Sequence, residues 1–430
     1  MLKTFIDFFK NKDLRKRIFF TLFILVIFRL GSSISAPGIN TAGLKFLSAN
    51  SLLNMMNILG GGSIEQMSIF SLGVGPYITA SIIIELLAMD IIPALAEMAK
   101  SGKKGRQQMN RITKYLSVVM ALVQGFFIIR YLDKTYTMYN FVQNPGFLSY
   151  LYISVIFTAG SMFVLWLADR ITDKGIGNGT SIIIFAGIVA DMPSTWQSVY
   201  ATFMGENATS TLGMGGFIAY CVMYIVIIVL VVLMQMAERR ILIQQSSSRA
   251  LNKTKGDLNH LPLKVNSASV TPVIFASALI QGPQIIASWV NKGAYDWLVK
   301  ICDFTSPWFL LFYATLIILF TFFYTNLTID PQKMADDLGK NGQYIPGVRP
   351  GTETKNYVSK VLNRITCLGA VLLAVIAILP YVMAIIIPGL SQRAALGGTG
   401  IIIVVGVAMD TIKQMKSQLT TKQYKSFVGK

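Results

Sequence analysis

The sequence predicts an all-α membrane protein with about ten membrane-spanning helices. Three observations lead to this fold class: the apolar fraction, the lengths of the apolar segments and the placement of the basic residues. The chain has 430 residues, of which 53% are apolar and only 13% are charged, whereas a soluble domain carries roughly a quarter charged residues. Because each crossing needs about 20 mostly apolar residues, a chain of this length can cross a bilayer many times.

Ten apolar segments are candidates for these spans. They lie near residues 18–36, 66–89, 115–132, 151–168, 178–190, 217–237, 268–290, 308–329, 366–388 and 397–412. The fifth and tenth are shorter than the usual minimum of roughly 17 residues. We expect these two either to be extended by neighbouring polar residues or to be sheltered from lipid by other helices.

The basic residues predict the orientation of the spans. Of the 38 Lys and Arg residues, 31 lie in the two termini and in the loops around Lys103, Lys174, Arg249 and Arg349. Six lie in the loops on the opposite side, and Arg29 lies inside the first span. Since short cytoplasmic loops retain positive charge, both termini are expected in the cytoplasm, which requires an even number of spans.

The order of the spans divides the chain into two halves of five. The first half is residues 1–190 and the second is residues 191–430, and an inverted pair of such halves is a frequent plan in transporters and channels. Two cytoplasmic connections are long and polar, at about 238–266 and 330–364. We interpret these two loops as docking arms for partners.

Several apolar segments are interrupted. Residues 51–63 form a short apolar stretch with three consecutive glycines, too short to cross, which is either a re-entrant element or an external amphipathic loop. Pro76 and Pro272 lie inside the second and seventh spans. A proline inside a span is expected to kink it and to free a carbonyl, so both segments should face protein or a water-filled cavity.

The sequence offers little for catalysis. His260 is the only histidine, which argues against zinc-peptidase or His-dependent triad chemistry. Gly175, Gly177 and Gly179 do not match a nucleotide-binding fingerprint, because no Gly-Lys-Ser/Thr follows them. We expect no cofactor, no metal and no enzymatic activity. The two rival classes are a secondary transporter for a small solute, which would want midplane charges, and an intramembrane protease or lipid transferase.

Seven separated motifs, in order along nearly the whole chain, resemble the SecY family of protein translocase channels. They are FRLG at 28–31, SIFSLGVGPYITASIIIEL at 68–86, KGIGNGTSIIIFAGI at 174–188, ERRI at 238–241, HLPLKVN at 260–266, IPGVRPG at 345–351, and GGT at 397–399 with Met409 and Asp410. The resemblance implies two inverted halves of five helices around a central pore. It also implies that the substrate is an unfolded polypeptide, and that hydrophobic segments leave sideways into the bilayer through a lateral gate.

The resemblance assigns residues to the pore. A closing ring of apolar side chains is expected at Val74, Ile78, Thr180, Ile184, Ile274 and Ile403. Val74 and Thr180 stand where the family usually has isoleucine. A short plug helix that fills the external funnel at rest is expected at Leu52, Leu53, Asn54, Met55, Met56, Asn57, Ile58, Leu59, Gly60 and Gly61. Polar residues of the lateral gate are expected at Thr79, Ser81, Gln124 and Asn266.

The resemblance also assigns partners. Contact with a motor ATPase resembling SecA or with the ribosome is expected at Arg349, Pro350, Gly351, Arg239, Arg240 and Lys264. The first arm departs from the family after residue 240, where few charges remain, so binding there is expected either to be weaker or to rely on Lys253, Lys255 and Lys264. Further expected partners are small membrane subunits resembling SecE and SecG, secretory signal peptides, nascent membrane proteins and membrane lipids. The expected location is the cytoplasmic membrane of a bacterium.

Overall fold

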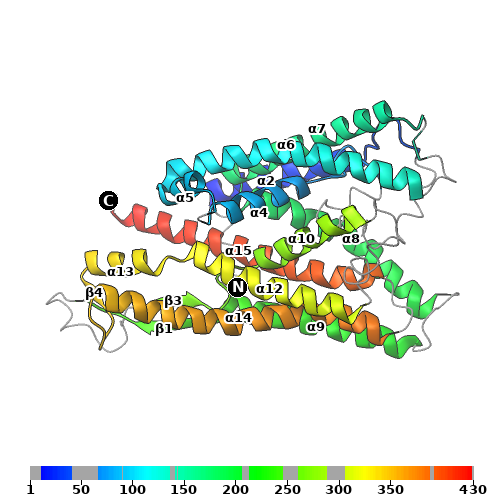
Figure 1. Cartoon of the computed structure of the whole chain (residues 1–430). Helices are drawn as coiled ribbons and strands as arrows, with labels where there is room; N and C mark the ends of the chain where they lie inside the picture. The colour runs from blue at the N-terminus through cyan, green and yellow to red at the C-terminus, as the bar shows by residue number, and fades with distance from the viewer. Residues whose placement is uncertain are drawn as a thin grey trace.

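Helices make up most of the described part of the chain (Figure 1). The computed structural model describes residues 11–40, 66–89, 91–135, 141–142, 144–205, 213–245, 260–287, 306–387 and 392–428. The helices of the first half of the sequence are α2 (Lys12–Ser32), α4 (Gly75–Leu87), α5 (Pro93–Lys100), α6 (Gly102–Thr135), α7 (Phe147–Lys174) and α8 (Gly179–Met204). Those of the second half are α9 (Gly213–Met236), α10 (Thr271–Ala287), α12 (Pro307–Thr328), α13 (Pro331–Lys340), α14 (Thr352–Ile386) and α15 (Gln392–Val428).

Each of the ten apolar segments falls on its own helix among these residues. Six helices, α6, α7, α8, α9, α12 and α14, include a segment long and apolar enough to cross a membrane, and α4 and α10 are shorter apolar helices. The all-α membrane fold is therefore confirmed, whereas the number of ten crossings stays a prediction.

For the short fifth span, the structure shows the first of the two expected alternatives, extension by neighbouring polar residues. Helix α8 has 26 residues and continues to Met204, well beyond residue 190, with Pro193 inside it. The polar residues that made this stretch resemble a loop bond back to the helix: Ser194 and Thr195 donate to the Asp191 carbonyl at 2.7 and 3.1 Å. Such hydroxyls satisfy their own hydrogen bonds inside a helix, so their presence does not end it. Helix α15 is likewise longer than its apolar segment, with 37 residues.

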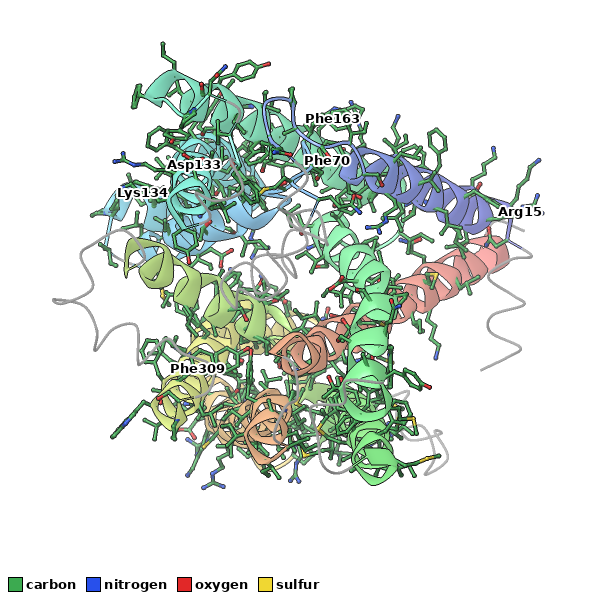
Figure 2. The ribbon with its side chains drawn as sticks, turned by 90° about the vertical axis from the view of Figure 1, so that its right-hand side faces the viewer. Arg15, Phe70, Asp133, Lys134, Phe163 and Phe309 are labelled. Carbon is green, nitrogen blue, oxygen red and sulfur yellow. The ribbon has the colours of Figure 1, made fainter. Side chains whose placement is uncertain are left out.

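The helices form two groups with α8 and α15 between them. Helices α2, α4, α6 and α7 pack on one another, as do α9, α10, α12 and α14, while α8 contacts α2 and α7 of the first group and α15 contacts α9 and α14 of the second. Contacts between the groups run through α8 with α15, α8 with α9, and α4 with α10. In Figure 2 the blue and cyan helices of the first group therefore lie above the yellow and orange helices of the second.

The core follows this arrangement. One large cluster of buried apolar residues takes members from α2, α4, α7, α8, α9, α10, α12, α14 and α15, so it extends through both groups. A smaller cluster lies within the first group, between α6 and α7, and includes Ala121, Ile128, Ile153 and Phe157. The boundary between the groups is thus packed by side chains of both.

Residues 66–74, which precede α4, are non-helical turns held inside the first group. Phe70 lies between Phe28 of α2 and Phe163 of α7, with ring centroids 6.2 and 5.8 Å apart (Figure 2). Ser161 of α7 donates a hydrogen bond to the Gly73 carbonyl at 2.8 Å. Helix α7 therefore supplies a hydrogen-bond donor to the backbone of this segment, which lipid could not do.

Gly160 allows this close approach. A Cβ at Gly160 would collide with the backbone carbonyl of Ile69, which cannot move away as a flexible side chain can. We predict that Gly160→Ala lowers the free energy of unfolding by about 1–3 kcal/mol, because overpacking displaces the segment before α4. The measurement is the thermal or denaturant midpoint of the purified protein in detergent. Gly215→Ala is the matched control, since Gly215 is an exposed glycine of α9 with open space around it; equal midpoints for the two variants would contradict the prediction.

Candidate functional site

Four helices bring five of the six predicted ring residues into the large central cluster. Val74 and Ile78 lie at the start of α4, Ile184 in α8, Ile274 in α10 and Ile403 in α15, and all five are at most 6% exposed. Two of these helices begin with a proline in the first turn. All five side chains are apolar and branched at Cβ, so the cluster provides no hydrogen-bonding group at this point.

The prediction that Pro76 and Pro272 kink their spans was wrong. Helix α4 begins at Gly75 and α10 begins at Thr271, so both prolines are in a first turn, where the missing N–H has no helical partner to lose. Helix α4 accordingly makes its first bond from the Ile78 amide to the Val74 carbonyl, at 3.1 Å. The interruption of these two spans is a helix start rather than a bend.

Thr180 lies outside the cluster, at the first turn of α8. Asn178 caps this helix, accepting from the Thr180 amide at 3.1 Å and from the Thr180 hydroxyl at 2.7 Å. Ile188, one turn after Ile184 on the same helix face, is 6% exposed and belongs to the cluster. Ile188 thus shares the large buried cluster with the other five residues, whereas Thr180 is partly exposed at the capped end of α8. The run of apolar residues at 182–189 contains several candidates at helical spacing, so the motif alone does not select the face.

Glycines of α15 let this helix approach the cluster closely. A Cβ at Gly400 would collide with the Ile188 side chain of α8, and one at Gly406 would collide with the side chain of Val270, which directly precedes α10. These contacts set α15 against both α8 and the start of α10. The close approach therefore joins two of the helices that supply the cluster.

Of the four predicted gate residues, Thr79 and Gln124 contact each other, whereas Ser81 and Asn266 bond elsewhere. Gln124 of α6 donates to the Thr79 hydroxyl of α4 at 3.3 Å, which joins two helices of the same group. Ser81 donates to Glu85 along α4 at 3.1 Å. Asn266 lies before α10 and donates to the Ser269 carbonyl at 2.9 Å. We call the contact between α4 and α10 the seam, because it joins the first group to the second through two helices of the cluster.

Aromatic residues that sequence reasoning did not single out lie behind the seam. Phe275 of α10 packs edge-on against Phe320 and Tyr324 of α12, at centroid distances of 6.0 and 5.8 Å. Their spacing of four residues in α12 was visible in the sequence, but many aromatic pairs share it. These contacts tie α10 to α12, on which α10 packs, while α10 also contacts α4.

The two predicted docking arms pack together into one structure. Strands β1 (Glu238–Leu242) and β3 (His260–Lys264) pair antiparallel, with Arg239 opposite Leu263 and Arg240 opposite Pro262. Strands β2 (Gln244–Gln245) and β4 (Gln343–Tyr344) pair the first arm with the second. A small cluster of Ile241, Leu263, Ile345 and Val358 lies beneath them. We call the β1–β3 pair the basic ladder, since Arg239, Arg240 and Lys264 are exposed on it.

Arg349 projects from a tight turn beside this cluster. The Val348 amide donates to the Ile345 carbonyl at 3.1 Å, and Gly347 between them has φ +80°, which glycine adopts without strain. Thr354 donates to the Arg349 carbonyl at 2.9 Å, which fixes the backbone after the turn. The Arg349 side chain itself is exposed. On the ladder, Arg240 forms an ion pair with Glu238 at 2.8 Å, so its guanidinium is partly neutralised.

Some predicted residues lie outside the described part of the chain. They are the whole plug segment, from Leu52 to Gly61, and Lys253 and Lys255 of the first arm.

Comparisons with known proteins decide the family. The family model described as SecY matches residues 68–412, which is most of the chain. The chain belongs to the SecY family. Among its relatives, a protein named "Protein translocase subunit SecY" from Bacillus licheniformis is 42% identical over 436 residues. One of the same name from Staphylococcus epidermidis is 40% identical over 435 residues. Both alignments cover all of this chain and all of the relative.

Solved structures share the SecY-family fold. One described as "The structure of a protein conducting channel" has a TM-score of 0.67 and 19% identity, covering 94% of this chain and 92% of that one. The canine Sec61 of a ribosome–channel complex from the endoplasmic reticulum has a TM-score of 0.63 and 18% identity, with the same coverage. At these identities the likeness concerns the fold.

Proposed function

We propose that this chain is the protein-conducting channel of a bacterial translocase. It moves unfolded secretory polypeptides across the cytoplasmic membrane and releases hydrophobic segments sideways into the bilayer. The observation that carries this proposal is the buried apolar cluster at Val74, Ile78, Ile184, Ile274 and Ile403, built by four helices from both halves of the chain. Two relatives with full coverage are named as protein translocase subunits, which supports the same function.

The buried apolar cluster has the properties expected of a closed constriction in a pore through which a polypeptide passes. A narrow apolar constriction disfavours water and ions, and it offers no strong binding site to a chain moving through it. We propose that the ring consists of these five residues and Ile188, in place of Thr180. The support is that Ile188 is buried in the same cluster, whereas Thr180 is held by Asn178 at the end of α8.

The seam suits a lateral exit, because α4 and α10 belong to different halves and each contributes to the ring. A segment in the open seam can partition between the pore and hydrocarbon. Each apolar residue favours exit by about 0.3–0.6 kcal/mol, while a central Lys or Asp costs about 2.5–3.5 kcal/mol on insertion scales. This sorting needs no catalytic residue, and we propose a channel rather than an enzyme.

The proposed topology has ten crossings, with both termini in the cytoplasm. The sidedness of the basic residues supports it. We place the boundary between the halves in the connection between α8 and α9, because residue 190 lies inside α8. The short segment at 51–63 is proposed as the plug on the external side, where its three glycines would provide a hinge.

The two packed arms suit a docking platform for a cytoplasmic partner. Arg349, Arg239, Arg240 and Lys264 are exposed on one structure that both arms build. Two solved structures of this fold are described as complexes with ribosomes. Exposed basic loops can bind RNA phosphates or an acidic protein surface through electrostatic contacts. We propose that the ribosome and a SecA-like motor dock here, and that SecE-like and SecG-like subunits complete the complex in the membrane.

Crosslinking of a substrate tests the proposed function directly. A photoreactive residue placed at Ile78 or Ile274 is expected to crosslink to a stalled secretory polypeptide in membranes, because the chain passes the ring. The same residue at Leu233 of α9, which is 60% exposed, serves as the control and is expected to give no substrate crosslink. Absence of crosslinks from both ring positions, together with saturable uptake of a small solute by vesicles, would contradict the proposed channel function and favour a small-solute transporter.

Substitution with asparagine tests the revised ring. We predict that Ile188→Asn, Ile274→Asn and Ile403→Asn each raise the resting ion conductance of reconstituted vesicles, because a polar group in the constriction favours water. Thr180→Asn is expected to leave conductance unchanged, since Thr180 lies at the capped end of α8. The measurement is ion flux without substrate. A leak from Thr180→Asn with none from Ile188→Asn would restore the ring expected from the motif.

Charge reversal tests the docking platform. Arg349→Glu is expected to reduce motor-driven export at least tenfold, because it places a negative charge at the tip that meets the partner. The fold should be retained, since the Arg349 side chain is exposed. Lys340→Glu, at the exposed end of α13, is the matched control for charge alone. Export by reconstituted vesicles measures both, and equal export in the two variants would remove Arg349 from the interface.

A further inference from the structure

A group of polar side chains lies where the basic ladder joins α10, and of its members only Asn266 was given a predicted role, at the lateral gate. We call it the root cluster, and it consists of Gln235, Asn266, Ser269 and Asp410. Ser269 donates to the Asp410 carboxylate at 2.6 Å, and Gln235 donates to the Ser269 hydroxyl at 3.3 Å. The Asn266 amide donates to the Ser269 carbonyl at 2.9 Å. Gln235 and Asn266 are each only 3% exposed.

The root cluster joins three elements at one residue. Gln235 is in α9, Asp410 is in α15, and Ser269 lies two residues before α10 begins. Ser269 therefore accepts from one helix and donates to another while its own backbone leads into a third. A short charge-assisted bond of this kind is among the stronger hydrogen bonds in proteins. The start of α10 is thereby held against α9 and α15.

The linker between the basic ladder and α10, residues 265–270, is held by contacts at both of its ends. The Val265 amide donates to the Ala237 carbonyl at 3.0 Å, so the ladder pairing continues to the end of α9. The Val265 carbonyl lies against Gly369 of α14, where a Cβ would collide with it. Val270, at the other end of the linker, packs against Gly406 of α15. A displacement of the ladder must therefore move the start of α10 or break these contacts.

Two features of this arrangement are locally unfavourable in free energy. Ser269 has φ +56°, a left-handed backbone that residues other than glycine rarely adopt. The side-chain oxygen of Asn266 is buried, and no donor in the described part of the chain reaches it. Strain and an unpaired buried acceptor persist only where surrounding contacts over-determine them. Movement of α10 away from the root cluster would relieve both.

Charged residues of the basic ladder also act on a side chain beside the root cluster. Lys413, which follows the span on α15, donates to the Gln235 carbonyl at 2.7 Å. Burial lowers the pKa of the Lys413 ammonium, and the like charge of Lys264 acts in the same direction. The carboxylates of Asp410 and Glu238 act in the opposite direction. Charges at the end of the ladder are thus close enough to act on the helix that holds Ser269.

We propose that the root cluster is a joint that transmits movement of the basic ladder to the start of α10, and so sets how readily the seam opens. In the described arrangement the Ser269–Asp410 bond holds α10 in place beside α4. When a partner displaces the ladder, the linker carries that displacement into Ser269, the bond to Asp410 breaks, and α10 moves from α4. Asp410 and Ser269 are positioning residues, and they act on the seam through α10. This inference rests on the proposed function.

The experiment measures release through the seam. Vesicles reconstituted with the full chain and its partners receive substrates whose test segments carry an increasing number of leucines. The readout is the ratio of segments released into the bilayer to segments translocated. Asp410→Ala and Ser269→Ala are each expected to raise this ratio about tenfold, as loss of a hydrogen bond to a charged group would. The double variant is expected to match the single ones.

Controls separate the joint from a general loss of stability. Ser267→Ala removes an exposed hydroxyl of the same linker that bonds only to the Lys264 carbonyl among the contacts described, and it should leave the ratio unchanged. Ser269→Gly relieves the left-handed backbone as well as removing the hydroxyl, and it should raise the ratio like Ser269→Ala. If Asp410→Ala does not fold, Asp410→Asn, which weakens the bond and keeps the shape, carries the test. Thermal midpoints of all variants are measured alongside.

A double-mutant cycle between the basic ladder and Asp410 tests whether movement of the ladder is transmitted through the root cluster. Arg240→Glu is expected to change the release ratio in an otherwise unaltered chain, because it weakens partner binding at the ladder. In an Asp410→Ala background the same change should have no further effect on the ratio. Additive effects, or an unchanged ratio in Asp410→Ala and Asp410→Asn, would overturn the joint. Vesicles of the unaltered chain that neither translocate nor release substrate would instead overturn the proposed function.

Discussion

The satisfaction of backbone hydrogen bonds inside a bilayer constrains this structure more than any other interaction. Helices α4 and α10 begin within apolar segments, so the residues before them carry carbonyls and amides that lipid cannot pair. The protein provides these partners from neighbouring helices, as Ser161 does for the Gly73 carbonyl at 2.8 Å. An unpaired group of this kind would cost several kcal/mol in hydrocarbon. The two interrupted spans are therefore possible only inside a ring of other helices.

The same constraint explains where small residues occur. A carbonyl that must reach a neighbouring helix needs a helix surface without a Cβ, and Gly160 and Gly369 provide such surfaces for Ile69 and Val265. The glycines of α15 serve side chains in the same way, at Ile188 and Val270. Close packing of backbones also favours helix association in membranes, where no hydrophobic driving force exists between helices. Glycines therefore allow both the close approach of the non-helical residues that precede α4 and α10 and the packing of the central cluster.

The sequence predicted the features that depend on local composition. The ten apolar segments each fell on a helix, and Arg349, which the motif at 345–351 singled out, is exposed after a turn that contains Gly347. The sequence did not predict features that depend on tertiary partners. For the fifth span it left two alternatives open, and the structure shows the polar extension, in which Ser194 and Thr195 bond to their own helix. The motif alone did not select among the isoleucines of α8, because several of them share helical spacing, so the proposed replacement of Thr180 by Ile188 depends on burial in the structure. The pairing of the two arms involves residues about 100 positions apart, which no local pattern encodes.

The position of the root cluster follows from the cost of charge in a membrane. An ionised carboxylate at the bilayer centre costs a few kcal/mol or more, whereas Asp410 lies at the end of its span and has Lys413 one turn further along α15. A strong, breakable bond can therefore be built there with Ser269. At the proposed ring no such bond is available, and the apolar contacts there are each weak and have no fixed partner. The proposed closure and the proposed joint thus use different residues at the start of α10: its first turn contributes Ile274 to the buried apolar cluster, and Ser269, just before it, carries the polar contact to Asp410.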